Sequence, residues 1–155
     1  MTTWIALLRR INVGGQNRVR MQDLKAAFES AGCLNVKSCL QSGNFVLQHR
    51  DTDDALLAQK LCAAVAAQCN LMLAILLLPA GELLAAMSAN PFPDAASDPQ
   101  TLHLWFMAET PAGPDYEGIE ACKADSESFA LLGRVFYLHA PDGIGRSRLA
   151  QRTER

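Results

Sequence analysis

Residues 9–20 of the chain read Arg9-Arg10-Ile11-Asn12-Val13-Gly14-Gly15-Gln16-Asn17-Arg18-Val19-Arg20. An apolar run that predicts a strand, Trp4 to Leu8, comes directly before them. Apolar residues at helical spacing, from Met21 to Ala31, come directly after. The stretch holds four arginines, two adjacent glycines and no acidic residue. Guanidinium groups and the free N–H groups at a helix start both attract anions, so we expect this arginine loop, residues 9–20, to meet a negative charge.

The elements after the arginine loop follow an order typical of a small α+β fold. After the first helix the sequence predicts a strand, a turn, a strand, a helix and a strand, at residues 35–41, 42–43, 44–48, 51–69 and 71–78. Asp51 or Thr52 is expected to cap the second helix. Its buried stripe is expected to comprise Ala58, Leu61, Cys62, Val65 and Cys69. The resulting order, β-α-β-β-α-β, is the ferredoxin-like plan.

The second half repeats this plan in permuted form, α-β-α-β-β-α. Its expected elements are a helix, a strand, a surface helix and a hairpin across Gly133, at residues 82–89, 102–108, 114–123 and 129–139. Residues 143–148 then lead into a terminal helix or tail. The prediction is therefore an α+β protein of two ferredoxin-like subdomains with antiparallel sheets. We expect them to span residues 1–78 and 79–155.

Composition narrows the functional class. Half of the 155 residues are hydrophobic and the formal net charge is −2, which argues against a general nucleic-acid or membrane binder. The charge is uneven: residues 1–78 carry eight basic and five acidic side chains, a net charge of +3, whereas the remainder is acidic. The apolar run 71–78 is too short to span a bilayer, and the N-terminus does not resemble a signal peptide. The five cysteines include no C-x-x-C pair. We expect a cytoplasmic protein without a metal or cofactor.

Topology predicts which loops meet. In a β-α-β-β-α-β unit the first two strands point the same way, so the arginine loop and residues 41–44 should share one edge of the sheet. Residues 143–148, Gly-Ile-Gly-Arg-Ser-Arg, are a second candidate for holding an anion, although a turn followed by an ordinary helix cap also explains them. The predicted ligand-binding residues are Arg9, Asn12, Gly14, Gly15, Arg18, Ser42, Gly43, Asn44, Arg146 and Ser147.

Catalytic machinery is not evident. His49 is expected near solvent, and His103 and His139 have no acidic residue at metal-ligand spacing. Ser42 lacks the Gly-x-Ser-x-Gly setting of an activated nucleophile, and Cys39 is expected to be a buried strand residue. The acidic residues between 109 and 127 are expected to form a solvated face. No general base can be named, so whether the protein is an enzyme stays open.

Several stretches resemble the bacterial domain-of-unknown-function 1697 family. They are Leu7 to Gly15, Val19-Arg20-Met21, Leu40-Gln41-Ser42-Gly43-Asn44 and Tyr137 to Leu149. The resemblance implies two ferredoxin-like subdomains and no established activity. Arg10 stands where the family usually has glycine, and Arg20 where it usually has proline. Family members usually continue into a stretch with an Asn-Trp-Asn motif, so we expect the second subdomain to be truncated relative to the family.

The sequence predicts that a small anionic or nucleotide-like ligand binds in a pocket at the edge formed by residues 9–20 and 41–44. Residues 143–148 are candidates for closing this pocket. Arg9 would bind the anion, and Asn12 and Asn44 would orient it. One alternative is a protein-interaction domain without a small-molecule ligand. The other is an RNA-binding module, which the fold plan permits, but the third strand offers only Phe45 for base stacking, so we do not expect nucleic acid to be the partner.

Overall fold

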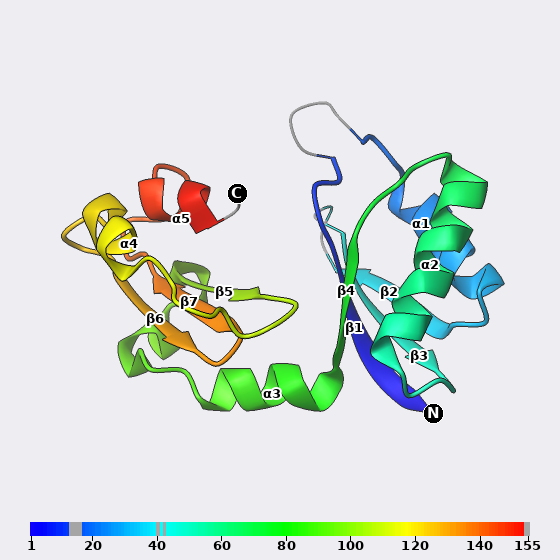
Figure 1. Cartoon of the computed structure of the whole chain (residues 1–155), viewed down its shortest axis with the longest axis horizontal. Coiled ribbons are helices and arrows are strands. Elements are labelled where there is room, and N and C mark those ends of the chain that lie inside the picture. The colour runs from blue at the N-terminus through cyan, green and yellow to red at the C-terminus, as the bar shows by residue number, and fades with distance from the viewer. Residues whose placement is uncertain (13–16, 40, 42, 154–155) are drawn as a thin grey trace. The chain divides into compact units, whose positions relative to one another are not determined.

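The protein is represented by a computed structural model, which describes residues 1–12, 17–39, 41 and 43–153. The chain divides into two compact units, Met1–Ala85 and Ala86–Arg155 (Figure 1). Within the described ranges, the first unit holds a four-stranded sheet and the second a three-stranded sheet. Every strand pair in both sheets is antiparallel. The predicted α+β class with two antiparallel sheets is confirmed.

The first unit has the predicted β-α-β-β-α-β order. Its elements are β1 (Thr2–Leu8), α1 (Met21–Ser30), β2 (Leu34–Cys39), β3 (Asn44–His49), α2 (Asp54–Cys69) and β4 (Ile75–Pro79). Helix α3 (Ala80–Ser88) follows. The strands lie in the order β2-β3-β1-β4, which is the ferredoxin-like order. Because β1 and β2 are both antiparallel to β3, they point the same way and end at the same edge.

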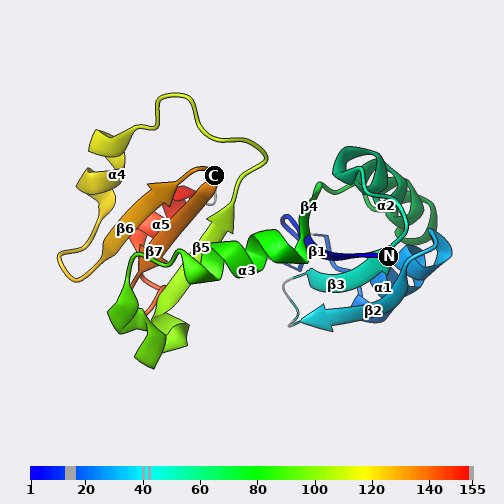
Figure 2. The same cartoon turned by 90° about the horizontal axis from the view of Figure 1, so that it is seen from below.

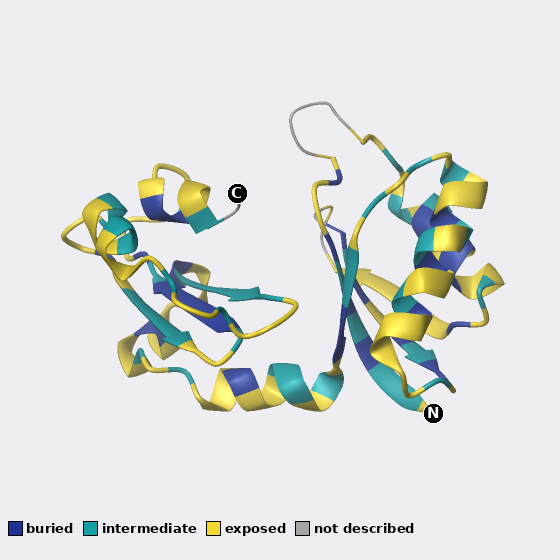
Figure 3. Ribbon diagram, in the orientation of Figure 1, coloured by how far each residue is buried: buried dark blue, intermediate teal, exposed yellow. Residues whose placement is uncertain are grey.

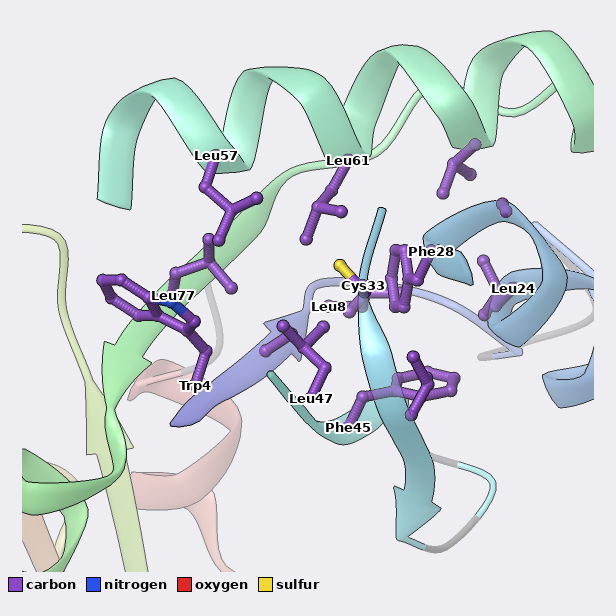
Figure 4. Close-up of a cluster of buried hydrophobic side chains, with 14 of the residues drawn as sticks. Trp4, Leu8, Leu24, Phe28, Cys33, Phe45, Leu47, Leu57, Leu61 and Leu77 are labelled. Atoms are coloured by element: carbon purple, nitrogen blue, oxygen red, sulfur yellow. The ribbon is translucent and has the colours of Figure 1, made fainter. Parts of the chain in front are cut away.

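Helices α1 and α2 cover one face of this sheet, and the core of the first unit lies beneath them (Figures 2 and 3). Strand β1 alternates as a half-covered strand should, with Trp4, Ala6 and Leu8 buried on the helix side. Phe28 and Phe45 meet edge to face, with ring centroids 5.1 Å apart. Figure 4 shows the side chains of α2 pointing toward those of the sheet. Each fully buried large apolar side chain contributes about 1.5–3 kcal/mol to folding.

The start of α2 differs from the prediction. Asp53, not Asp51 or Thr52, caps this helix: its Oδ1 accepts a hydrogen bond from Leu56 N at 2.8 Å. Asp51 instead forms an ion pair with Lys60. Three acceptable capping side chains stand in a row at this point, and the one selected depends on where the preceding chain leaves the sheet.

The buried stripe of α2 and the start of β4 also shift. Leu57 is fully buried, although the prediction left it out, whereas Ala58 and Cys62 are only half-buried. At the first turns of α2, the buried face is therefore centred one residue earlier than predicted, on Leu57 and not on Ala58. Strand β4 begins at Ile75 and not at Leu71, because its ladder with β1 begins there.

The second unit repeats part of the first. Beyond α3 and two short 3-10 turns, η1 (Pro93–Ser97) and η2 (Pro99–Thr101), come β5 (Leu102–Phe106), α4 (Tyr116–Cys122), β6 (Ser128–Leu132), β7 (Val135–His139) and α5 (Arg148–Thr153). The sheet order is β5-β7-β6. Both the chain order β5-α4-β6-β7 and this sheet order match those of β1-α1-β2-β3 in the first unit.

Apolar side chains cover both faces of the second sheet. On one face, Phe136 and Leu138 pack with residues of α4 and α5, among them Ile119 and Leu149. The other face packs against the end of α3 and the segment after it, through Val135, Tyr137, Leu104, Phe106, Ala86 and Phe92. The Tyr137 hydroxyl donates a hydrogen bond to the Ala86 carbonyl at 2.7 Å, so this buried phenol is satisfied.

Candidate functional site

The arginine loop and the β2–β3 turn meet at one edge of the first sheet. Leu8 N, at the end of β1, donates a hydrogen bond to Gly43 O at 3.0 Å. Asn12 Nδ2 lies 3.4 Å from Gln41 O, across a separation of 29 residues in sequence. The juxtaposition expected from topology is therefore present in the described parts of both segments.

The arginine loop is closed by its own asparagines. Asn12 Nδ2 donates to Val19 O at 3.1 Å, and Asn12 Oδ1 accepts from Val19 N at 3.0 Å. Asn17 Nδ2 donates to Arg10 O at 3.0 Å, and Asn12 N donates to Asn17 O at 3.3 Å. The amide of Asn12 is thus engaged with the chain itself, so it shapes the loop and has little capacity left to orient a ligand.

Among the described residues of this loop, three that are not glycine have positive φ angles. The values are 59° for Arg10, 54° for Asn12 and 50° for Asn17. Asparagine tolerates this left-handed conformation, whereas for arginine it costs about 1–2 kcal/mol. Arg10 thus has the backbone conformation typical of glycine, the residue expected at this position from the family resemblance.

Gly43 is required by packing. Its φ is +83°, and a Cβ added there would collide with the side chain of Ile11 and lie 3.0 Å from Leu8 Cβ. Ile11 is only 2% exposed and anchors the first part of the arginine loop in the core. The glycine therefore allows the loop and the turn to approach each other, and its predicted contact with a ligand stays a prediction.

A hollow of about 650 Å³ lies beside the arginine loop, where α1 begins and α2 ends. We call it the arginine-loop hollow. The residues that matter for its chemistry are Asn12, Arg18, Arg20, Asp23, Gln68 and Cys69. Its size is in the range of small-molecule sites. Gln68 is fixed there, because its Nε2 donates to Ser30 Oγ at 2.5 Å.

The charge in this hollow is concentrated at Arg18. Arg20 and Asp23 form a two-point ion pair, with Nε–Oδ2 at 2.8 Å and Nη2–Oδ1 at 2.9 Å. Hydrogen bonding by Arg20 lowers the pKa of the Asp23 carboxyl. Arg18 is exposed and has no hydrogen bond or ion pair with any residue that the structure describes. The hollow therefore keeps one positive charge in excess.

The start of α1 adds a second positive element. Arg20 is the N-cap residue, and its side chain makes no capping hydrogen bond to the helix backbone. The first-turn N–H groups of a helix carry partial positive charge. At this helix they are not covered by a capping side chain, and the N-cap residue itself lines the hollow.

Cys69, which lines the hollow, is not activated. Burial, and secondarily the charge of Asp23, raise the pKa of Cys69, so its thiol stays protonated at neutral pH. Cys39, at the end of β2, is exposed, and the prediction of a buried strand cysteine is wrong.

The structure separates the predicted ligand-binding residues. Arg18 and Asn12 line the hollow. Arg9 is exposed next to β1 but is not part of the lining, and Asn44 is half-buried at the start of β3. Gly14, Gly15 and Ser42 lie outside the described residues.

The predicted ligand-binding residues do not include the other five residues that line the hollow: Val19, Arg20, Asp23, Gln68 and Cys69. Topology contained the signal. Since β3 is antiparallel to β1, α2 runs back toward the arginine loop, so the end of α2 must lie beside the start of α1. The end of α2 is not one of the loops at the sheet edge, so the positions of those loops alone do not reveal it.

In the second unit, Ser147 serves as a helix cap. It is 4% exposed, and its Oγ accepts a hydrogen bond from Ala150 N at 3.0 Å at the start of α5. Arg146 is exposed. This geometry matches the alternative stated for residues 143–148, a turn followed by an ordinary cap. A contribution of Arg146 to a ligand site stays a prediction.

Two other predictions about polar residues are wrong. His49, expected near solvent, is 9% exposed, and its Nδ1 accepts a hydrogen bond from Asp51 N at 3.0 Å. Glu127, expected on a solvated acidic face, is 6% exposed, and its carboxylate accepts from Ala124 N at 2.9 Å. Both side chains stabilise turns. Burial lowers the pKa of His103, which therefore stays neutral near pH 7.

The described ranges offer no metal-binding group of three or more histidine, cysteine or acidic side chains. Across the same ranges, every helix is too short or too polar to cross a bilayer.

The face of the first sheet that the helices leave uncovered lacks a base-stacking platform in the described residues. Phe45 points into the core and is fully buried, as are Phe28 and, at 2% exposure, Trp4. These three are the aromatic residues of the first unit. RNA-recognition modules of this topology stack bases on sheet aromatics, which are not available here.

The first unit is therefore a ferredoxin-like domain with a polar, positively charged hollow at one sheet edge, and the whole chain pairs it with a second α+β unit. Residues 1–137 match the model of a protein family of unknown function, DUF1697. The chain belongs to this family. It is also similar in structure to a conserved bacterial protein, SP0830, from Streptococcus pneumoniae, with 25% identity and a TM-score of 0.66 over 91% of this chain and 78% of that one. No curated protein matches the sequence.

Proposed function

We propose that the first unit binds a small anionic or nucleotide-like ligand in the arginine-loop hollow, with Arg18 as its principal charged contact. The observation that carries the proposal is an exposed arginine in a hollow of ligand size, beside a helix start that no side chain caps. Arginine and helix N-termini are the two groups that proteins use most directly for phosphate and carboxylate.

The neighbouring groups support this assignment. The ion pair with Asp23 fixes Arg20 at the mouth of α1, so the guanidinium of Arg18 is the group with its donors available to a ligand. Gln68 supplies a neutral amide on the opposite helix. Asn12 holds the loop that carries Arg18 in place through its bonds to Val19.

The expected compartment is the cytoplasm. All five cysteines are free, which suits a reducing environment.

Thermal unfolding in the presence of inorganic phosphate, nucleotides, sugar phosphates and dicarboxylates tests the proposal. A ligand present at a hundred times its dissociation constant stabilises by about 2.7 kcal/mol, which raises Tm by several degrees. We expect one ligand class to produce this shift and Arg18→Ala to abolish it. Arg9→Ala measures whether the second predicted arginine contributes.

Arg50→Ala is the matched control. Arg50 is also exposed, but it follows the end of β3 and so lies at the opposite edge of the same sheet. If Arg50→Ala reduces the shift as much as Arg18→Ala does, binding reflects general charge, and the proposal fails. Absence of a shift with every ligand class would favour the alternative of a protein-interaction domain.

A further inference from the structure

The arginine-loop hollow brings together two helix ends of opposite polarity. Arg18 and the start of α1 supply positive charge, as described above. Gln68 and Cys69, which also line the hollow, are the last two residues of α2. The last carbonyl groups of a helix carry partial negative charge, and the last turn of α2 contains no basic side chain to offset it. A bare anion is complementary to the first of these helix ends only.

The amide of Gln68 has a fixed orientation. The Ser30 hydroxyl donates a hydrogen bond to Ala27 O at 2.7 Å, so its oxygen is left to accept one. Gln68 Nε2 donates to that oxygen at 2.5 Å. The nitrogen of the amide is therefore directed to Ser30. Its Oε1 accepts no hydrogen bond from any residue that the structure describes, so this oxygen is left as an acceptor.

The other side-chain oxygens of the described lining residues already have partners. Asn12 Oδ1 accepts a hydrogen bond from Val19 N at 3.0 Å. Both carboxylate oxygens of Asp23 accept hydrogen bonds from Arg20. Gln68 Oε1 is thus the side-chain acceptor that the hollow offers to a ligand. A hydroxyl or amino group can donate to it, whereas an ionised carboxylate accepts only and cannot.

We infer that the ligand of this hollow carries hydroxyl or amino donors together with its anionic group, and that Gln68 selects for those donors. Phosphorylated sugars, phosphorylated polyols and hydroxy acids have this chemistry. The inference rests on the function proposed above, in which Arg18 binds the anionic group. The hollow of about 650 Å³ suits such a ligand, because an inorganic phosphate ion would fill only a small part of it.

Two pairs of compounds with matched charge test the inference by isothermal titration calorimetry. Glycerol 3-phosphate and propyl phosphate differ in their hydroxyl groups alone, and so do malate and succinate. The pair that binds shows whether the anionic group is a phosphate or a carboxylate. Within that pair, the hydroxylated compound should bind to the unchanged protein about tenfold more tightly, because it alone donates to Gln68 Oε1.

Three variants separate the two parts of the ligand. Gln68→Leu removes the acceptor and should reduce the tenfold preference to less than about threefold. Gln68→Glu keeps an acceptor oxygen, so it should keep the preference while its added negative charge weakens the binding of both compounds. Arg18→Ala should weaken the binding of both compounds to the same extent, because both carry the anionic group.

Gln59→Leu is the matched control. Gln59 is also an exposed residue of α2, but it is not part of the lining of the hollow. This variant should keep the tenfold preference. Gln68 is exposed as well, so all the glutamine variants should fold, which thermal unfolding checks.

Equal, Arg18-dependent binding of both members of a pair would overturn the inference and leave the proposed function intact. A preference that persists in Gln68→Leu would also overturn the inference. Binding that Arg18→Ala does not weaken would contradict the proposed function, and the inference with it. If none of the four compounds binds, the inference fails, whereas the proposed function still stands on any Arg18-dependent shift in the wider ligand panel.

Discussion

The helices α1 and α4, which follow the first strand of each sheet, have different N-termini. In the first unit the segment after β1 carries four arginines, and α1 begins without a capping side chain. In the second, the equivalent helix α4 is capped by Asp115, whose Oδ1 accepts a hydrogen bond from Gly118 N at 2.9 Å. Its Oδ2 pairs with Arg152 of α5 at 2.5 Å. The same topological position thus lacks a capping side chain in one unit and is occupied by a carboxylate of the chain in the other.

This difference shows why topology alone does not define a site. Both helix starts follow the first strand of a β-α-β-β arrangement, so both carry the same backbone partial charge. An acid of the chain itself satisfies that charge at α4. At α1 the nearest acid, Asp23, is bound to Arg20. Four substitutions test this difference between the two units.

The largest effect is expected from Gly43→Ala. The new methyl group would collide with Ile11 in a backbone conformation that alanine rarely adopts, so we expect a loss of about 2–4 kcal/mol in unfolding free energy. Gly133→Ala is the control, because Gly133 also has positive φ but nothing lies within 4 Å of its added Cβ. It should lose only about 1 kcal/mol. Equal losses in urea unfolding would show that the packing of Ile11 is not the cause.

Asp115→Ala should come next, with a loss of about 1 kcal/mol, because it removes the cap of α4. It also removes the ion pair with Arg152. Asp125→Ala, at an exposed acid outside any helix of the same unit, should be close to neutral. Chemical denaturation followed by circular dichroism compares the two, and an equally stable Asp115→Ala protein would contradict the role given to this cap.

Arg10→Gly should stabilise the protein by about 0.5–1 kcal/mol, since glycine adopts the left-handed conformation of this position without strain. Arg9→Gly is a matched control that removes the same charge from the adjacent position, where φ is not positive. It should not stabilise. Tm is measured by differential scanning calorimetry. An increase in Tm for both variants would contradict backbone strain at Arg10 as the cause of the stabilisation.

The smallest effect concerns Asp23. Its folded-state pKa lies below the ordinary value of 3.8, mainly because Arg20 donates hydrogen bonds to it. Its contribution to stability is therefore complete above the unfolded-state pKa and is lost as pH falls through the lower folded-state value. In Asp23→Asn this part of the acid dependence should disappear, as measured by urea midpoints between neutral pH and strongly acidic pH. Identical acid profiles for the two proteins would count against a paired Asp23.

Most of the fold followed from the sequence because its signals are local and repeated. Apolar runs gave the strands, and Gly133 gave the hairpin in the second unit. What the sequence could not decide were choices among equivalent neighbours. Asp51, Thr52 and Asp53 all suit a helix start, and only the path of the chain out of β3 selects Asp53.

The candidate site followed less completely, because it depends on contacts between elements distant in sequence. The arginine loop and the turn at Gln41 were placed together correctly from strand direction. The Asn12 amide is hydrogen-bonded to Val19, and Gly43 leaves room for the side chain of Ile11. Both contacts depend on side-chain positions at the ångström scale. A pattern of residue types contains no such information.

The amide of Asn12 has a consequence for how this protein ages. Asparagine side chains lose ammonia slowly and become carboxylates, which accept hydrogen bonds but cannot donate them. At Asn12 that change would turn the donated bonds to Val19 O and Gln41 O into contacts between oxygens. A molecule in which Asn12 has become an aspartate should therefore lose the shape of the arginine loop while its core remains folded. A mass increase of about one dalton at this residue would mark the aged molecules.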